Sequence, residues 1–233
     1  INGSKMWTSD ATLCDYIFVL VRTSPEKPKH EGISLMLVDM RQPGVTVSPI
    51  QLISGASPFC ETHFSDAVVP LDDVIGGLDR GWTVGKRLLQ FERSTHAGIN
   101  ISGSQGGRSE KSQMPALVAR YVSSQSGQLT DPALRRWLTE FEMNSHAQRI
   151  TQRRAIEELS SRAPGFTSSA VKLTNALNIQ DGDELLVAAM GSQGLRWDPE
   201  TADADELAAL QKWLYQKSLT IAGGTKEVQL NII

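Results

Sequence analysis

The sequence predicts an α+β protein in which a small antiparallel β-barrel or sandwich precedes an up-and-down domain similar to a four-helix bundle. Over residues 1–78, short β-branched and aromatic runs alternate with turn signals, which is typical of an all-β module. From about residue 79, glycine and proline become rare, while alanine, leucine, arginine, glutamate and glutamine become common. This change of composition predicts two domains, residues 1–78 and 79–233.

The β module rests on runs at residues 16–21, 33–38 and 45–47, which are rich in β-branched and aromatic side chains. Turn formers such as Pro43-Gly44 separate these runs. So many short strands close together favour a barrel or a sandwich, and the pattern leaves both open.

Helices are expected at about residues 79–110, 113–124, 131–162, 166–190 and 203–219, with a last helix starting near Thr225. Asp131-Pro132 is a good N-cap followed by proline at the first helical position. An apolar stripe follows at Leu134, Trp137, Leu138, Phe141 and Ile150, for which packing in a helical bundle is a sufficient explanation.

The composition excludes some classes of function. The chain has 233 residues, 40% of them hydrophobic, and a formal net charge of -3, which gives no electrostatic argument for nucleic acid or a membrane surface. Its longest strongly apolar run, residues 16–21, is too short to span a bilayer, and no signal peptide is visible. A cytoplasmic protein is therefore expected. The chain begins at Ile1 without methionine and ends inside an expected helix, so we expect part of a longer polypeptide.

The two cysteines, Cys14 and Cys60, form no spacing typical of a metal or redox site. We expect both to be reduced, buried thiols, and the sequence predicts no metal site.

Glu92 is the most informative charged residue. On a helix, Leu88, Leu89, Glu92, His96 and Ile99 share one largely apolar face. A carboxylate on a buried apolar face is costly unless it is paired, protonated or used in catalysis. Spacing alone favours the simpler explanation, an ion pair with Arg93 or His96.

Three separated groups of motifs follow one another along the chain. They are Asn2-Gly3-Ser4-Lys5-Met6-Trp7-Thr8-Ser9, then Gly81-Trp82 with Phe91-Glu92-Arg93, then Met190-Gly191-Ser192-Gln193-Gly194 with Ala222-Gly223-Gly224-Thr225-Lys226-Glu227-Val228-Gln229. In this order they resemble the middle β-domain and the C-terminal helical domain of acyl-CoA dehydrogenases. The resemblance covers essentially the whole chain. The family's N-terminal helical domain is absent from it.

The resemblance implies a flavoprotein that binds FAD and oxidises the Cα–Cβ bond of an acyl-CoA thioester, as in fatty-acid β-oxidation. It also implies an electron-transfer flavoprotein as electron acceptor and a homo- or hetero-tetramer formed through the helical domain.

The resemblance further assigns cofactor contacts. Trp7 is expected to pack beside the isoalloxazine ring and Ser9 to hydrogen-bond near its N5 atom. Gly191 and Ser192 match a motif that approaches the flavin of a neighbouring subunit. The simpler alternatives are a half-buried strand aromatic for Trp7, a turn hydroxyl for Ser9 and a helix C-cap for Gly191.

Thr225 and Glu227 match family positions that lie against the cofactor, although capping of the last helix explains them equally well. The Gly223 backbone amide is expected to help stabilise the enolate oxygen of the substrate. Arg93, next to Glu92, is expected to bind the substrate.

The position of the base is the distinctive feature of this sequence. Most family members carry the catalytic glutamate in the late turn, where this chain has Gly223. A subset that includes isovaleryl-CoA and long-chain enzymes carries it on the first helix, immediately before an arginine, as in Glu92-Arg93. The resemblance therefore implies that Glu92 abstracts the Cα proton while hydride leaves Cβ for the flavin.

Two departures from the family pattern leave alternatives open. Residues 108–112 lack the usual Arg-Phe-Gly signature, and Ala188 replaces a common glutamine. The chain could therefore be a non-catalytic or half-site partner in a hetero-oligomer. An acyl-CoA oxidase or a flavin monooxygenase on the same scaffold is the other alternative.

Overall fold

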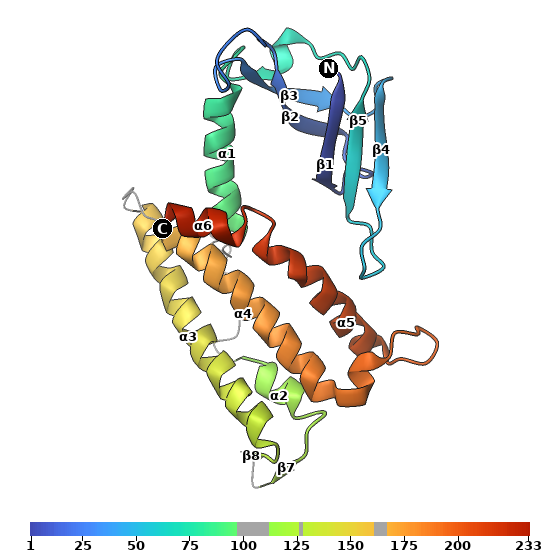
Figure 1. Cartoon of the computed structure of the whole chain (residues 1–233), viewed down its shortest axis with the longest axis vertical. Coiled ribbons are helices and arrows are strands. Elements are labelled where there is room, and N and C mark those ends of the chain that lie inside the picture. Colours follow the sequence, from blue (N-terminus) through green and yellow to red (C-terminus); the bar gives the residue numbers. More distant parts are fainter. Residues whose placement is uncertain (97–111, 126–127, 161–166) are drawn as a thin grey trace. The chain divides into compact units, whose positions relative to one another are not determined.

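The computed structural model describes residues 1–96, 112–125, 128–160 and 167–233 (Figure 1). These residues form two compact units, Ile1–Phe91 and Glu92–Ile233. The predicted α+β class is confirmed, because the first unit is built mainly of strands and the second mainly of helices. Helix α1 (Gly81–His96) begins in the first unit and ends in the second.

The first unit contains two three-stranded antiparallel sheets. One has the order β1-β5-β4 and the other β2-β3-β6. The strands are β1 (Gly3–Ser9), β2 (Tyr16–Arg22), β3 (Ile33–Asp39), β4 (Val45–Ile50), β5 (Phe59–Phe64) and β6 (Val74–Ile75), and the short helix η1 (Leu71–Asp73) precedes β6. The two sheets do not close into a barrel within the described residues.

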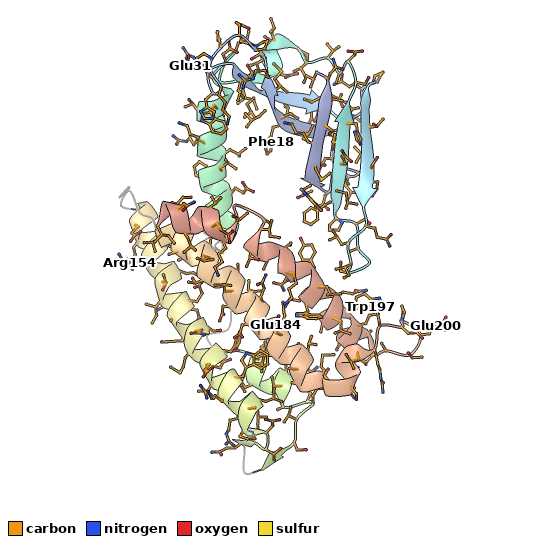
Figure 2. The ribbon with its side chains drawn as sticks, in the orientation of Figure 1. Phe18, Glu31, Arg154, Glu184, Trp197 and Glu200 are labelled. Atoms are coloured by element: carbon orange, nitrogen blue, oxygen red, sulfur yellow. The ribbon has the colours of Figure 1, made fainter. Side chains whose placement is uncertain are left out.

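The core of this unit lies between the two sheets. Val19, Val38 and Phe64, from β2, β3 and β5, are buried together with Ala67. Burial of each of the three larger side chains contributes about 1.5–3 kcal/mol. Strand β2 alternates as a half-buried strand should, since Val19 is buried and its neighbour Phe18 is exposed (Figure 2).

Asp79 fixes the backbone just before α1. Its carboxylate accepts hydrogen bonds from the Thr23 hydroxyl at 2.6 Å, the Ser24 hydroxyl at 2.9 Å and the Lys27 ammonium at 2.7 Å. Its backbone N–H donates to the Ser34 hydroxyl at 2.8 Å. The hydrogen bond from Lys27, followed by those from Thr23 and Ser24, lowers the pKa of Asp79 to about 2.

The second unit is helical. Its elements are α2 (Met114–Val118), α3 (Pro132–Ser160), α4 (Thr167–Met190), α5 (Ala204–Gln216) and α6 (Lys226–Ile232), with the 3-10 helices η2 (Gly191–Leu195) and η3 (Lys217–Thr220) and a small hairpin of β7 (Ser124–Gln125) and β8 (Gln128–Leu129). Figure 1 shows α3, α4 and α5 side by side, with the chain direction alternating between them. The core of this helical unit includes Val118, Phe141 and Leu185.

Several predicted helix limits hold, while others do not. The Asp131 carboxylate accepts hydrogen bonds from the N–H groups of Ala133 and Leu134 at 2.8 and 3.0 Å, which confirms the predicted N-cap. The helix expected at 113–124 is only the short α2, and the one expected at 203–219 ends as the 3-10 helix η3. Helix α1 is described as far as His96, and residues 97–111 lie outside the described residues.

Three predictions of burial were wrong. Cys14 is exposed in the turn region between β1 and β2, whereas Cys60 is buried in β5 as expected. Ile150 is exposed, because it follows Phe141 by nine residues and so lies on about the opposite side of α3. Leu88 and Leu89 are 36% and 43% exposed, so the apolar face of α1 is not buried by the described residues.

No helix among the described residues is long and apolar enough to cross a membrane.

Candidate active site

A two-glycine turn precedes the last helix. Gly223 and Gly224 have φ values of +64° and +96°, in the left-handed region. A residue with a side chain is disfavoured there by about 1–2 kcal/mol, so both positions favour glycine. We refer to residues 222–225 as the late turn.

Thr225 ends the late turn as the N-cap of α6, as predicted. Its hydroxyl oxygen accepts a hydrogen bond from the Val228 N–H at 3.3 Å. The pKa of Glu227 is lowered, first by a hydrogen bond from its own backbone N–H and then by one from the Thr225 hydroxyl. Both side chains therefore take part in capping, whatever else they contact.

Lys172 ties the late turn to α4. Its side chain is only 2% exposed, and its ammonium donates to the Gly224 carbonyl at 2.6 Å and the Leu219 carbonyl at 3.1 Å. These carbonyls lie 52 and 47 residues further along the chain. A charge this deeply buried is tolerated only with strong hydrogen bonds, and each of these two is charge-assisted.

Gln229 holds the same turn from α6. Its side chain is fully buried, and its amide nitrogen donates to the Gly223 carbonyl at 3.1 Å and the Gly224 carbonyl at 3.4 Å. The Gly224 carbonyl thus accepts from two buried side chains. Consequently two successive peptide planes of the late turn have fixed orientations.

Glu92 belongs to the second unit and is partly buried on α1. Its charge acts on Lys172: burial lowers the pKa of the Lys172 ammonium, and the charge of Glu92 opposes that shift. The structure therefore joins Lys172 to the late turn by hydrogen bonds, and the charge of Glu92 acts on the same lysine. The backbone of Arg93 continues α1, but its side chain lies outside the described part of the chain.

Trp7 and Ser9 belong to the first unit. Trp7 lies at an irregularity of β1 between Lys5 and Thr8, has a φ of +65° and is 57% exposed. Its ring meets that of Phe59 edge to face at 6.1 Å between centroids. A bulky aromatic residue in the left-handed region is strained, and such strain is found preferentially at functional sites. Ser9 is exposed and pairs with Phe59 in the strand register.

Gly191 and Ser192 lie at the other end of α4 from the late turn. Gly191 has a φ of +58° directly after the last residue of α4, which agrees with its expected use as a helix C-cap. It follows Lys172 by nineteen residues, or about 28 Å along a helix. The structure thus separates this motif from Glu92 and the late turn within the second unit.

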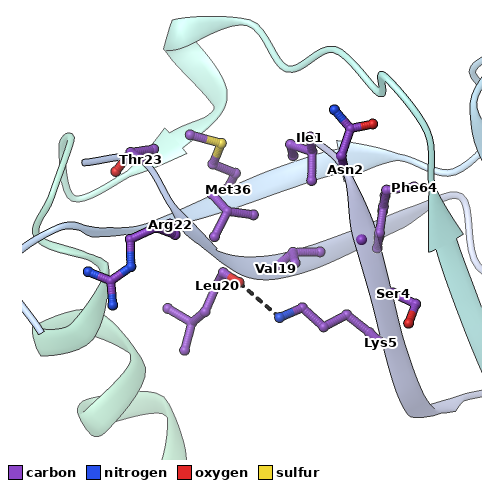
Figure 3. Close-up of a pocket in the computed structure, with 12 residues that line it drawn as sticks. Ile1, Asn2, Ser4, Lys5, Val19, Leu20, Arg22, Thr23, Met36 and Phe64 are labelled. Carbon is purple, nitrogen blue, oxygen red and sulfur yellow. Dashed lines mark hydrogen bonds between the residues drawn. The ribbon is translucent and has the colours of Figure 1, made fainter. Parts of the chain in front are cut away.

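Two larger cavities do not contain the predicted site residues. One of about 390 Å³ lies in the first unit between β1 and β2, where the Lys5 ammonium donates to the Leu20 carbonyl at 3.0 Å (Figure 3). The other, of about 540 Å³, lies between α3 and α4 and is lined by polar side chains that include Gln148 and Asn178. The described residues contain no cluster of histidine, cysteine or carboxylate side chains suited to a metal ion.

Comparison with protein families decides the relationship. Residues 1–67 match the family described as acyl-CoA dehydrogenase, middle domain, and residues 79–233 match acyl-CoA dehydrogenase, C-terminal domain. The chain belongs to the acyl-CoA dehydrogenase family. This confirms the resemblance that the ordered motifs carry, and it places the chain in a family of oxidoreductases.

Relatives of this acyl-CoA dehydrogenase chain include "Acyl-CoA dehydrogenase IpdE1" of Mycobacterium tuberculosis, which is 34% identical over 100% of this chain and 57% of its own length. "Acyl-CoA dehydrogenase FadE34" of the same organism is 30% identical over 100% of this chain and 30% of its own length. Among solved structures, "Tcur3481-Tcur3483 steroid ACAD" matches with a TM-score of 0.80 and 28% identity, over 99% of this chain and 58% of that one. The chain thus spans little more than half of the first of these relatives.

Sequence reasoning missed Lys172 and Gln229. Lys172 is a lysine inside an apolar stretch of α4, between the buried Val171 and Leu173, and that unusual setting was the available signal. No signal in the sequence indicated the role of Gln229, because its partners are backbone carbonyls in a turn whose conformation the sequence does not reveal.

Proposed function

We propose that the protein carrying this chain is a flavin-dependent acyl-CoA dehydrogenase that oxidises the Cα–Cβ bond of an acyl-CoA thioester. Residues 1–78 and 79–233 would be its middle and C-terminal domains. The observation that supports this best is the grouping of Glu92 with the late turn through Lys172. In the family the base comes either from that turn or from the first helix, and in this chain Lys172 binds the turn while the charge of Glu92 acts on it.

Glu92 is the proposed base. The Cα proton of a thioester is only weakly acidic, so its removal needs a positioned carboxylate. Gly223 has no side chain that could act, and the helix-borne Glu92 supplies the carboxylate instead. The Gly223 amide is the proposed donor to the developing enolate oxygen, in a turn whose next two peptide planes are held by Gln229 and Lys172. Arg93 is proposed on the substrate side of the same helix.

The residues present fit an FAD cofactor. Trp7 offers an exposed aromatic ring, Ser9 an exposed hydroxyl, and Thr225 and Glu227 polar groups at the start of α6. When bound, FAD supplies the acceptor for the hydride that leaves Cβ. The proposed tasks of the chain's own residues are to hold the ring, to orient the thioester and to remove the proton at Cα. An electron-transfer flavoprotein is the proposed electron acceptor.

Gly191 and Ser192 are proposed to contact the cofactor of a neighbouring subunit. Their distance from the late turn along α4 supports this, because one active site cannot easily reach both ends of that helix. The steroid ACAD structure, 28% identical to this chain, is named for two components, Tcur3481 and Tcur3483, which favours a hetero-oligomer over a homo-oligomer. In such an assembly this chain could occupy a half-site, since it departs from the family pattern at Ala188.

The deciding experiment is anaerobic flavin reduction by the purified holoprotein with a panel of acyl-CoA thioesters. Because the same solved relative is called a steroid ACAD, a steroid-derived thioester is the first panel member, beside straight and branched chains. Bleaching of the oxidised flavin band by at least one thioester is the expected result. Less than one flavin per subunit would favour the half-site alternative, and rapid reoxidation by oxygen would favour an oxidase or a monooxygenase. A flavin that none of the thioesters reduces would contradict the proposal.

A further inference from the structure

Lys172 ties the late turn to α4, and none of the sequence motifs accounts for it. A lysine in a helical core is costly, because its ammonium loses hydration and its long side chain loses rotamer freedom. The described structure offsets that cost with hydrogen bonds to two backbone carbonyls. Such an arrangement fixes backbone conformation, because the acceptors belong to the peptide planes themselves.

The orientation of the late turn follows from peptide geometry. No peptide bond in the described chain is cis, so each N–H points away from the carbonyl of its own peptide plane. The Gly223 and Gly224 carbonyls point toward Gln229 and Lys172. The N–H groups of Gly224 and Thr225 must therefore point away from these two side chains. Successive N–H groups beside residues with positive φ form a concave surface that favours negative charge.

We infer that Lys172 is a positioning residue: by binding the Leu219 and Gly224 carbonyls, it ties η3 and the Gly224–Thr225 peptide plane to α4, and it thereby fixes the conformation of the late turn that is proposed to receive the enolate oxygen. This inference rests on the proposed function for its chemical meaning. Its structural part, the control of the late turn by Lys172, stands independently. Lys172 itself contacts neither substrate nor cofactor and acts through the turn.

The test compares Lys172→Met with the parent protein. Methionine keeps an unbranched apolar side chain but donates to neither carbonyl. The first readout is amide hydrogen exchange at Ala222 and Gln229, whose N–H groups donate to the Ser218 and Thr225 carbonyls on either side of the turn. We expect exchange there to accelerate about tenfold or more, the scale of one lost charge-assisted hydrogen bond. Exchange in α3 should not change.

The second readout separates positioning from binding. In Lys172→Met the rate constant of flavin reduction should fall about tenfold, while the Kd of the thioester stays within about twofold. The reason is that the turn stabilises the thioester oxygen mainly in the transition state, when negative charge develops on that atom. Lys172→Arg should recover most of the rate and the protection. A cavity of about 40 Å³ lined by Lys172, Asn175, Ala176, Ile179 and Leu219 leaves room for the larger guanidinium.

Lys86→Met on α1 is the matched control, since it removes the same charge from an exposed lysine. It should leave both readouts unchanged. If Lys172→Met does not fold, Lys172→Gln keeps a neutral donor and should show the same effects more weakly. Unchanged exchange together with an unchanged reduction rate in a folded Lys172 variant would overturn the inference. A parent protein that no thioester reduces would instead overturn the proposed function, while the exchange experiment would still judge the role of Lys172 in the turn.

Discussion

At the scale of single residues, Asp79 makes the most specific prediction about pH. Its folded-state pKa of about 2 lies below its ordinary value of 3.8. Because the folded-state value is depressed, the stabilisation by Asp79 is fully present above about pH 4 and is lost as the pH falls toward 2. Denaturant titrations between pH 5 and 2 should therefore show a steeper loss of stability for the parent than for Asp79→Asn. Equal slopes would contradict the prediction, and Asp72→Asn on the neighbouring η1 is the control.

Trp7 makes a second prediction, which concerns strain. Both Trp7→Ala and Trp7→Gly remove the ring, but only glycine adopts a φ of +65° without cost. We expect Trp7→Gly to be more stable than Trp7→Ala by about 1 kcal/mol in urea unfolding. FAD affinity should fall equally in both variants, because the loss of ring contact is the same. A more stable alanine variant would show that the backbone at Trp7 is not strained.

Individual residues were predictable from the sequence where their partners are local. The Asp131 and Thr225 caps followed from spacing, because each side chain bonds N–H groups two or three residues away. Lys172 was not predictable, because its carbonyl partners are 47 and 52 residues distant and depend on how η3 and α6 meet α4. Ile150 was wrongly assigned to the buried apolar stripe of α3. It lies about half a turn around the helix from Phe141, and it is exposed.

At the scale of elements, the late turn and α1 are proposed as two alternative positions for the catalytic carboxylate. If both face one substrate carbon, the base should be movable. Gly223→Glu in a Glu92→Gln background should restore part of the lost rate of flavin reduction. The rescue should be partial, because a φ of +64° disfavours glutamate by about 1–2 kcal/mol.

The control for this rescue is Gly223→Gln in the same background. It introduces the same shape and the same backbone strain without a proton acceptor, so it should restore nothing. Equal rates for the two double variants in stopped-flow experiments would show that the late turn does not face the reacting carbon.

Elements were predicted best where composition and periodicity agree. The expected helices at 131–162 and 166–190 correspond closely to α3 and α4, whose apolar residues pack against each other. The end of α5 was predicted less well, because the change to the 3-10 helix η3 leaves no mark in composition. The pairing of strands into two sheets was equally hidden, since it depends on contacts between distant segments.

At the scale of the whole molecule, the position of Gly191 and Ser192 bears on assembly. They lie about 28 Å along α4 from Lys172, which supports the proposal that they act at the cofactor of another subunit. We expect the protein that carries this chain to form a tetramer, either of one chain or of two different chains. Light scattering coupled to gel filtration should give about four subunit masses, and a flavin-containing monomer would contradict this.

The α+β organisation was visible in the sequence, because the change near residue 79 replaces turn formers with helix formers. The order of the motifs predicted the family, which the comparison with family models confirms. The grouping of Glu92, Lys172 and the late turn required the fold, because these segments are separated by most of the C-terminal domain.

The central claim is that Glu92 is the base, and one measurement tests it most directly. Glu92→Gln keeps the shape and polarity of the side chain but removes the proton acceptor. In stopped-flow experiments on the holoprotein, we expect the rate of thioester-dependent flavin reduction to fall by at least about 10²-fold, with thioester binding retained. Glu200→Gln, in the exposed loop before α5 (Figure 2), should reduce flavin at the parental rate. A parental rate in Glu92→Gln would contradict the account and leave Glu92 as a structural partner of its neighbours.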